Sequence, residues 1–189
     1  MKLTWFGDRS FRFHLGGQIV VVEADSAPHQ VDRAELTSGA DVLVGFDTAL
    51  PSADTLTWRP RAPQRLLDAG ADLRPADIVS VGDGSILIDA EDERPLLILT
   101  SSIGALGRWA GKAVIILVGR DLGGRAVQLV ESFAPPLIAL AGSEPEIDAA
   151  LPSFATGAII PALSPSSPAL PSKSDLRPPF SLSFARAHC

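Results

Sequence analysis

The side chains that could hold a metal ion or act as nucleophiles are few in this sequence and widely spaced. The 189 residues contain three histidines, His14, His29 and His188, and no two of them have the spacing of a metal-binding pair. The one cysteine, Cys189, stands next to His188 at the chain end, and chain ends fray, which argues against a catalytic thiol there. The sequence therefore predicts no histidine-rich metal centre, no internal disulfide and no cofactor.

Two glycine-rich segments could hold an anion on backbone amides. Residues 81–85 (VGDGS) are followed by a β-branched run, whereas a phosphate-binding loop leads into a helix, so a hairpin turn is the favoured interpretation. Residues 119–125 (GRDLGGR) connect a predicted strand to a predicted helix and place two arginines beside backbone amides. For this second segment an anion site and a plain strand–helix loop are both open, with the loop favoured.

Composition limits the class of protein. The chain is 46% apolar and 20% charged, a balance typical of one globular domain, and its length is near that of a single domain. A net charge of −6 argues against attraction to nucleic acid or to an anionic membrane. Because no 18-residue apolar window and no signal-peptide core are found, we expect no membrane insertion and a cytoplasmic location.

The first third of the chain predicts a β-meander followed by a helix and a buried strand. Apolar and alternating runs separated by the Gly16-Gly17 turn indicate a hairpin, and both Trp5 and Phe11 fall on core positions. The expected elements are strands at Lys2–Phe6, Phe11–Leu15 and Ile19–Val22, a helix within Val31–Ser38 that ends before Gly39, and a buried strand at Asp41–Phe46.

The rest of the chain predicts further strands and then strand–helix–strand units. The expected strands are Ile78–Val81, Ser85–Asp89, Pro95–Thr100, Ala113–Val118 and Leu137–Leu140, with helices at Pro63–Ala69, Gly124–Phe133 and Pro145–Leu151. Ser164–Pro179 is rich in Pro and Ser and is predicted to be extended, and Phe180–Ala185 alternates like an edge strand. This order of elements favours an α/β layered sandwich over a doubly wound sheet.

The opening of the chain resembles the ascorbate-phosphate lactonase-like branch of the metallo-β-lactamase superfamily. The family frame M-K-h-T-W-L-G-H-x-x-F is matched by MKLTWFGDRSF at residues 1–11, and the next two family segments by GGQIVVVEA at 16–24 and ADVLVGFD at 40–47. The resemblance implies a four-layer αββα sandwich of the metallo-β-lactamase type over residues 1–189, as one domain that includes the extended segment 164–179.

The same resemblance implies that the family's metal ligands have been lost. Aligned without a gap, Asp47, Ala49 and Ser52 stand where the family has its three histidines, and Pro51 stands in place of its aspartate. LTSS at residues 99–102 corresponds to the family's A-G-D-T turn, whose aspartate bridges the metals. Gly142 replaces the late histidine, and the opening Gly-His is Gly7-Asp8. A dinuclear site needs several N and O donors, so we expect no bound metal and no zinc-dependent hydrolase.

A vestigial pocket is expected where the family has its metal site, formed by Asp8, Glu23, Asp47 and Ser101. Clustered carboxylates could work as acid and base or hold one hard cation such as Mg²⁺, although backbone amides also satisfy aspartates at strand ends. No histidine or lysine is placed to activate Ser101.

Two functions remain open. The favoured one is a non-catalytic, metal-free binding or assembly protein, such as an accessory subunit, with no catalytic residues. The alternative is a hydrolase or lactonase with an atypical carboxylate site. We expect a protein partner or a homo-oligomer, with Ser164–Pro179 or Phe180–Ala185 at the contact.

Overall fold

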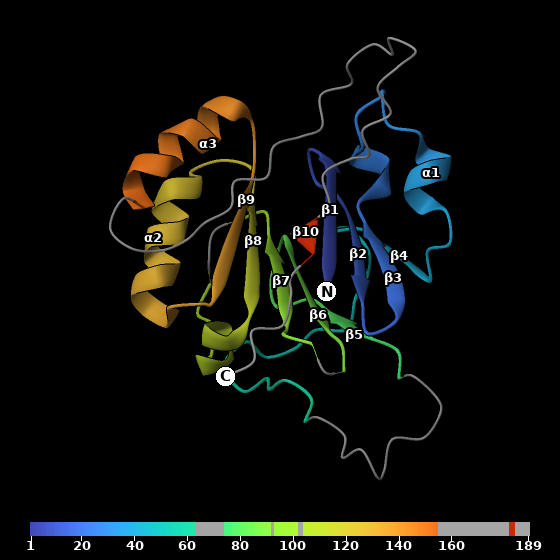
Figure 1. Ribbon diagram of the computed structural model, residues 1–189. Helices are drawn as coiled ribbons and strands as arrows, with labels where there is room; N and C mark the ends of the chain where they lie inside the picture. The colour runs from blue at the N-terminus through green and yellow to red at the C-terminus, as the bar shows by residue number, and fades with distance from the viewer. Residues whose placement is uncertain (63–73, 92, 102–103, 155–181, 184–189) are drawn as a thin grey trace.

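The computed structural model describes residues 1–62, 74–91, 93–101, 104–154 and 182–183. This part of the chain is a mixed α/β protein with two open mixed sheets and few helices (Figure 1). The helix predicted at Pro63–Ala69 and the Pro-rich segment Ser164–Pro179 lie outside the described residues. Of the edge strand predicted at Phe180–Ala185, only Leu182–Ser183 is described, and it is a strand at the edge of a sheet.

The first sheet is the predicted meander with one strand added on either side. Antiparallel pairing joins β1 (Lys2–Gly7), β2 (Ser10–Leu15) and β3 (Gln18–Val22). The β2–β3 turn uses Gly16 and Gly17, whose φ angles of 53° and 76° are those that glycine adopts without steric cost. β10 (Leu182–Ser183) pairs with β1, and β4 (Val42–Val44) runs parallel to β3 at the other edge.

The strand predicted at Asp41–Phe46 is shorter than expected and is not fully buried. β4 spans three residues, and the side chain of Leu43 is 59% exposed. The reason is its place at the sheet edge, where one face of the strand is left uncovered. The predicted helix before it is α1 (Arg33–Thr37), which begins after the N-cap Asp32.

Arg12 holds α1 against the first sheet. Its guanidinium donates to the carbonyls of Glu35, Leu36 and Ser38, at 3.1, 2.8 and 2.7 Å. These are carbonyls at the C-terminal end of the helix, which have no partner within the helix and attract a cation. His14, two residues along β2, is half-buried, and burial together with Arg12 and Lys2 lowers its pKa.

The second sheet contains the strands predicted for the middle of the chain. Its order is β5 (Asp77–Val79), β6 (Ser85–Asp89), β7 (Leu96–Leu99), β8 (Val114–Val118) and β9 (Leu137–Ala141). The first two connections are antiparallel, so VGDGS at 81–85 is a hairpin turn as expected; β7, β8 and β9 are parallel. Apolar side chains on both faces of β7 and β8 explain their continuous hydrophobic runs.

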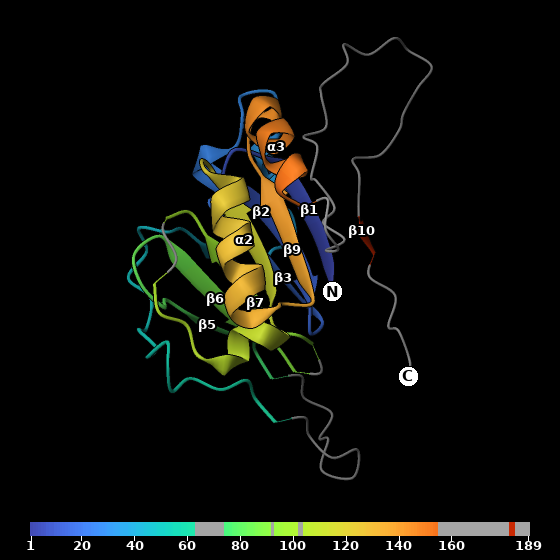
Figure 2. The same cartoon turned by 90° about the vertical axis from the view of Figure 1, so that its left-hand side faces the viewer.

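Two longer helices follow the parallel strands. α2 (Leu122–Phe133) begins two residues before the predicted start, and α3 (Glu144–Ala150) matches the second prediction closely. Figure 2 looks onto these helices and shows them lying across the sheet that contains β7 and β9. Three short 3₁₀ helices were not predicted: η1 (Ala24–Ser26), η2 (Arg108–Lys112) and η3 (Leu151–Phe154). No described helix is both long and apolar enough to cross a bilayer.

Buried side chains form two clusters that meet at the second sheet. One cluster joins the two sheets: it takes Trp5, Phe11 and Phe13 from the first and Ile86, Ile98 and Ile116 from the second, among others. The other joins the opposite face of the second sheet to α2, α3 and η2. Trp5 is 7% exposed and Phe11 is fully buried, so their predicted place in the core is confirmed.

Candidate functional site

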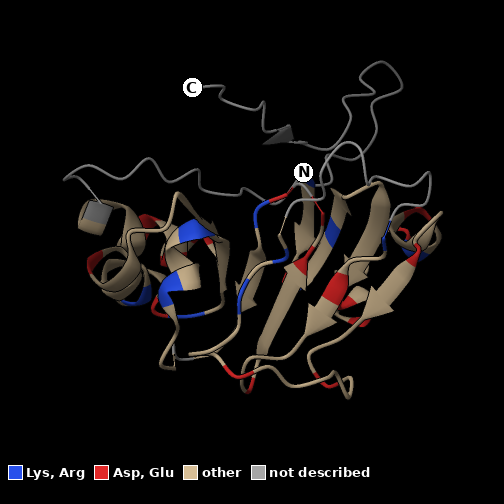
Figure 3. Ribbon diagram, turned by 90° about the horizontal axis from the view of Figure 1, so that it is seen from below, with Lys and Arg blue, Asp and Glu red and all other residues tan. Residues whose placement is uncertain are grey.

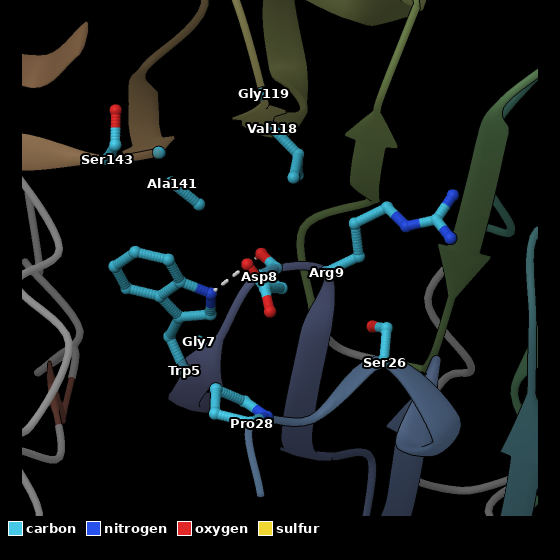
Figure 4. Close-up of a pocket in the computed structure, with 11 residues that line it drawn as sticks. Trp5, Gly7, Asp8, Arg9, Ser26, Pro28, Val118, Gly119, Ala141 and Ser143 are labelled. Atoms are coloured by element: carbon cyan, nitrogen blue, oxygen red, sulfur yellow. Dashed lines mark hydrogen bonds between the residues drawn. The ribbon is translucent and has the colours of Figure 1, made fainter.

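A cavity of about 570 Å³ opens where strands from both sheets end. The β1–β2 turn and the segment after β3 form one wall, and the C-terminal ends of β8 and β9 form the other (Figure 4). The lining residues are Trp5, Gly7, Asp8, Arg9, Ser26, Pro28, Val118, Gly119, Ala141, Gly142 and Ser143. Crevices beyond the carboxyl ends of strands are common binding sites in α/β proteins, and this volume suits a small molecule.

Asp8 is the one predicted site residue that lines this cavity. It occupies the β1–β2 turn with φ at 44°, a left-handed conformation that aspartate tolerates better than most residues. The backbone carbonyl of Asp8 accepts the indole N–H of Trp5 at 3.1 Å, which fixes the turn over the aromatic ring. This turn places the exposed carboxylate of Asp8 beside Trp5 (Figure 4).

Glu23 lies behind the cavity wall and is already engaged. One carboxylate oxygen accepts the Phe46 N–H at 2.8 Å, and the other faces the Arg9 guanidinium at 3.8 Å. The same guanidinium lies 5.8 Å from the centre of the Phe46 ring. Glu23 therefore ties the chain after β3 to the chain after β4 and offsets the charge of Arg9.

Asp47 and Ser101, the other two predicted site residues, do not line the cavity. Asp47 is exposed in the turn after β4. The Ser101 hydroxyl donates to the Asp83 carbonyl at 2.6 Å, and the neighbouring Thr100 hydroxyl donates to the Gly84 carbonyl at 2.9 Å. Both hydroxyls thus fasten the end of β7 to the β5–β6 turn.

The residues that line the cavity do not fit the dinuclear metal site that the resemblance implies. Asp8 and Gly142, which stand at the family's opening and late histidines, come from opposite sheets and border the same cavity. Of these two residues only Asp8 has a carboxylate that could ligate a metal ion, because Gly142 has no side chain. Across the residues that the structure describes, no three His, Cys, Asp or Glu side chains come together as a metal-binding group.

Gly142 is also confined by its neighbours. A Cβ atom added there would lie 2.8 Å from a methyl carbon of Leu122 and 3.1 Å from the Gly119 carbonyl oxygen. A side chain at this position would need the Leu122 side chain to shift and the Gly119 carbonyl to move by a few tenths of an ångström. Glycine therefore allows the ends of β8 and β9 to lie close together, and these ends form this wall of the cavity.

Arg125, in the segment 119–125, is buried and faces away from solvent. Its guanidinium donates to the carbonyls of Leu99 and Val118 at 2.9 Å each and of Arg120 at 3.3 Å, while its Nε has no partner among the described residues. Burial lowers the pKa of Arg125, and Asp121 opposes that shift. Arg125 is therefore engaged by carbonyls, which favours the plain strand–helix loop over an anion site.

Several lining residues were missed from the sequence. Pro28, Val118 and Ser143 carry no chemistry that marks them, but two of them, Val118 and Ser143, stand at or just after the C-terminal end of a strand. Because ligands often bind beyond the carboxyl ends of strands, that position could have identified them as candidate site residues.

No protein-family model matches the chain, and no curated protein or solved structure matches it either.

Proposed function

We propose that this chain is a non-catalytic, metal-free protein of the metallo-β-lactamase type that acts by binding, as an accessory or assembly protein. The observation that carries the proposal is the pairing of Asp8 with Gly142 on one cavity. The two positions are 134 residues apart in the sequence, and both are among those that the resemblance assigns to the metal site; Asp47 and Ser101, which it also assigns there, do not line the cavity. In this proposal the chain has the cavity of the family, but residues that cannot ligate the metals stand in place of the metal-ligating side chains.

The proposed fold is the four-layer αββα sandwich. Three observations support it: one apolar cluster contains side chains of both sheets, a second lies under α2 and α3, and Arg12 ties α1 to the first sheet. Figure 1 places α1 and the α2–α3 pair on opposite sides of the molecule, as this fold requires.

The alternative, a hydrolase or lactonase with a carboxylate site, receives less support. Such a site needs two carboxylates near the reacting atoms, or one with an activated nucleophile. Among the described residues that line the cavity, Asp8 is the one carboxylate, and both oxygens of Glu23 face other groups. The Ser101 hydroxyl is directed to a backbone carbonyl.

Chelation tests the proposal. A metal that binds the folded state stabilises it, so removing a resident metal would lower the melting temperature. We expect the same melting temperature with and without EDTA, measured by circular dichroism, and no rise on addition of Zn²⁺ or Mn²⁺. A melting temperature several degrees lower in EDTA would contradict the metal-free proposal and favour the alternative, a metal-dependent hydrolase or lactonase.

The proposal includes a protein partner or self-association. If the domain has kept its fold but has no catalytic groups, the simplest explanation is that its surface binds another protein chain. Figure 3 shows positions of Lys and Arg and positions of Asp and Glu spread over the same described ribbon, so this part of the chain carries charges of both signs that a partner could meet. The contact is proposed at 164–179, or at 180–185, where β10 extends the first sheet as an edge strand.

Light scattering tests this contact. The full chain is expected to run above its monomer mass of 19.8 kDa, either alone or with a partner from its host. A version that ends after residue 163 should lose the association, because both proposed contact segments are removed. If the full and shortened chains both run as monomers and retain the same partners, the contact lies elsewhere.

A further inference from the structure

We propose that the cavity binds a small organic cation, an amine or guanidinium joined to an apolar group, with its charge on the carboxylate of Asp8 and its apolar part against Trp5 and Pro28. This inference rests on the proposed function, because a carboxylate without a catalytic partner is free to hold a ligand. It adds the chemical class of that ligand.

The first argument is the charge that remains open in the cavity. Asp8 and Arg9 are the charged lining residues. Arg9 already faces Glu23 and Phe46, and Figure 4 shows its guanidinium pointing away from Trp5. In the part of the chain that the structure describes, the Asp8 carboxylate makes no hydrogen bond or ion pair. The charge available to a ligand is therefore negative.

Neighbouring charges reinforce this sign. Glu144 and Glu146 stand in the first turn of α3, directly after Ser143 in the cavity wall. The opposite charges of Arg120 and Asp121, which follow the lining residue Gly119, offset each other. The two glutamates therefore add negative charge near the same wall, which favours a cation over an anion.

The second argument is the apolar character of the walls beside Asp8. The lining includes Trp5, Pro28, Val118 and Ala141. An indole face attracts a cation as well as apolar groups, and small-molecule sites combine such walls with a few polar anchors. A hydrated metal ion would not use these walls, but a hydrophobic amine would.

The third argument is backbone strain around the cavity. Four described non-glycine residues have positive φ, and three of them lie on the loops that border it: Asp8, Glu23 and Asp121. Left-handed conformations cost about 1–3 kcal/mol each for ordinary residues and gather at functional sites. Aspartate adopts this conformation at less cost than most residues, so the strain is greatest at Glu23; three such turns around one place support loops that are held in a fixed shape.

The test is a titration with three probes of matched shape: phenethylamine, phenethyl alcohol and phenylacetate. Backbone amide shifts at Gly7, Gly119 and Gly142 report binding in the cavity. The amine is expected to bind best. Asp8→Asn should weaken the amine about tenfold or more, because a charge-assisted hydrogen bond is lost while asparagine keeps the left-handed turn. The matched control Asp83→Asn, on the exposed β5–β6 turn, should leave binding unchanged.

The inference is overturned if the amine does not shift these amides at millimolar concentration, if phenylacetate binds more tightly, or if Asp8→Asn binds the amine as well as the unchanged protein does. The proposed function fails on a different result. Stoichiometric metal would overturn the metal-free proposal whatever the amine does, and loss of amine binding would leave that proposal standing.

Discussion

Trp5→Ala is expected to lower the free energy of unfolding by roughly 3–5 kcal/mol, the usual result of truncating a buried tryptophan. Trp5 is 7% exposed and lies in the cluster shared by the two sheets. Its ring stacks on Phe11 with centroids 6.4 Å apart, and its indole N–H holds the Asp8 carbonyl. The substitution removes the burial, the stacking and the bond that fixes the cavity turn.

Urea denaturation measures this effect, and Leu43→Ala provides the control. Leu43 is also apolar and lies in the same sheet, but its side chain is 59% exposed. Its truncation should change stability by no more than about 0.5 kcal/mol. If Trp5→Ala were as stable as the unchanged protein, the placement of Trp5 in the core between the two sheets would be wrong.

Arg125→Met is expected to cost roughly 3 kcal/mol of stability. Methionine retains much of the apolar stem but removes the donors to the Leu99 and Val118 carbonyls, which then stay buried without partners. Each unsatisfied buried acceptor costs about 1–3 kcal/mol, and relief of the buried charge offsets part of this total.

Arg120→Met is the control for Arg125→Met. Arg120 is exposed and five residues earlier, so the same chemical change there should alter stability by no more than about 0.5 kcal/mol. Arg125→Lys should not restore stability fully, because one ammonium lacks the planar fork that reaches carbonyls of two strands. Equal stability of Arg125→Met and the unchanged protein would show that the carbonyls find other partners.

The sequence predicted best those elements whose local pattern agrees with their packing. The Gly16-Gly17 turn fixes the β2–β3 hairpin, and Ser85–Asp89 has the bounds that the pattern indicated. β4 was predicted poorly because its burial depends on its place at the sheet edge. That place is set by pairing between residues about 22 positions apart, which local pattern does not contain.

The start of α2 shows a second limit. The predicted helix began at Gly124, two residues too late, because the chain up to Gly123 was assigned to the strand–helix loop. In the structure Gly123 is helical and packs closely against α3: a Cβ there would lie 3.2 Å from the backbone of Ala150, so glycine suits this contact. With the correct start, Leu122, Arg125, Ala126 and Leu129 form one buried helical face, and the burial of Arg125 could have been predicted from that spacing.

The candidate site could be predicted in part. Asp8 was expected at the pocket and lines the cavity, whereas Asp47 is exposed in the turn after β4 and the Ser101 hydroxyl donates to the Asp83 carbonyl. The place of Ser101 depends on a bond between loops 18 residues apart, and residue types alone carry no information on such a bond.

The metal content of the purified protein tests the central proposal most directly. The chain should be produced in medium that contains Zn²⁺, Mn²⁺ and Fe²⁺ and then analysed for these elements per mole of protein. The account predicts far less than one equivalent of any of them, because Asp8 and Gly142 stand on the cavity in place of histidines. One or two equivalents of a single metal, retained through gel filtration, would contradict it.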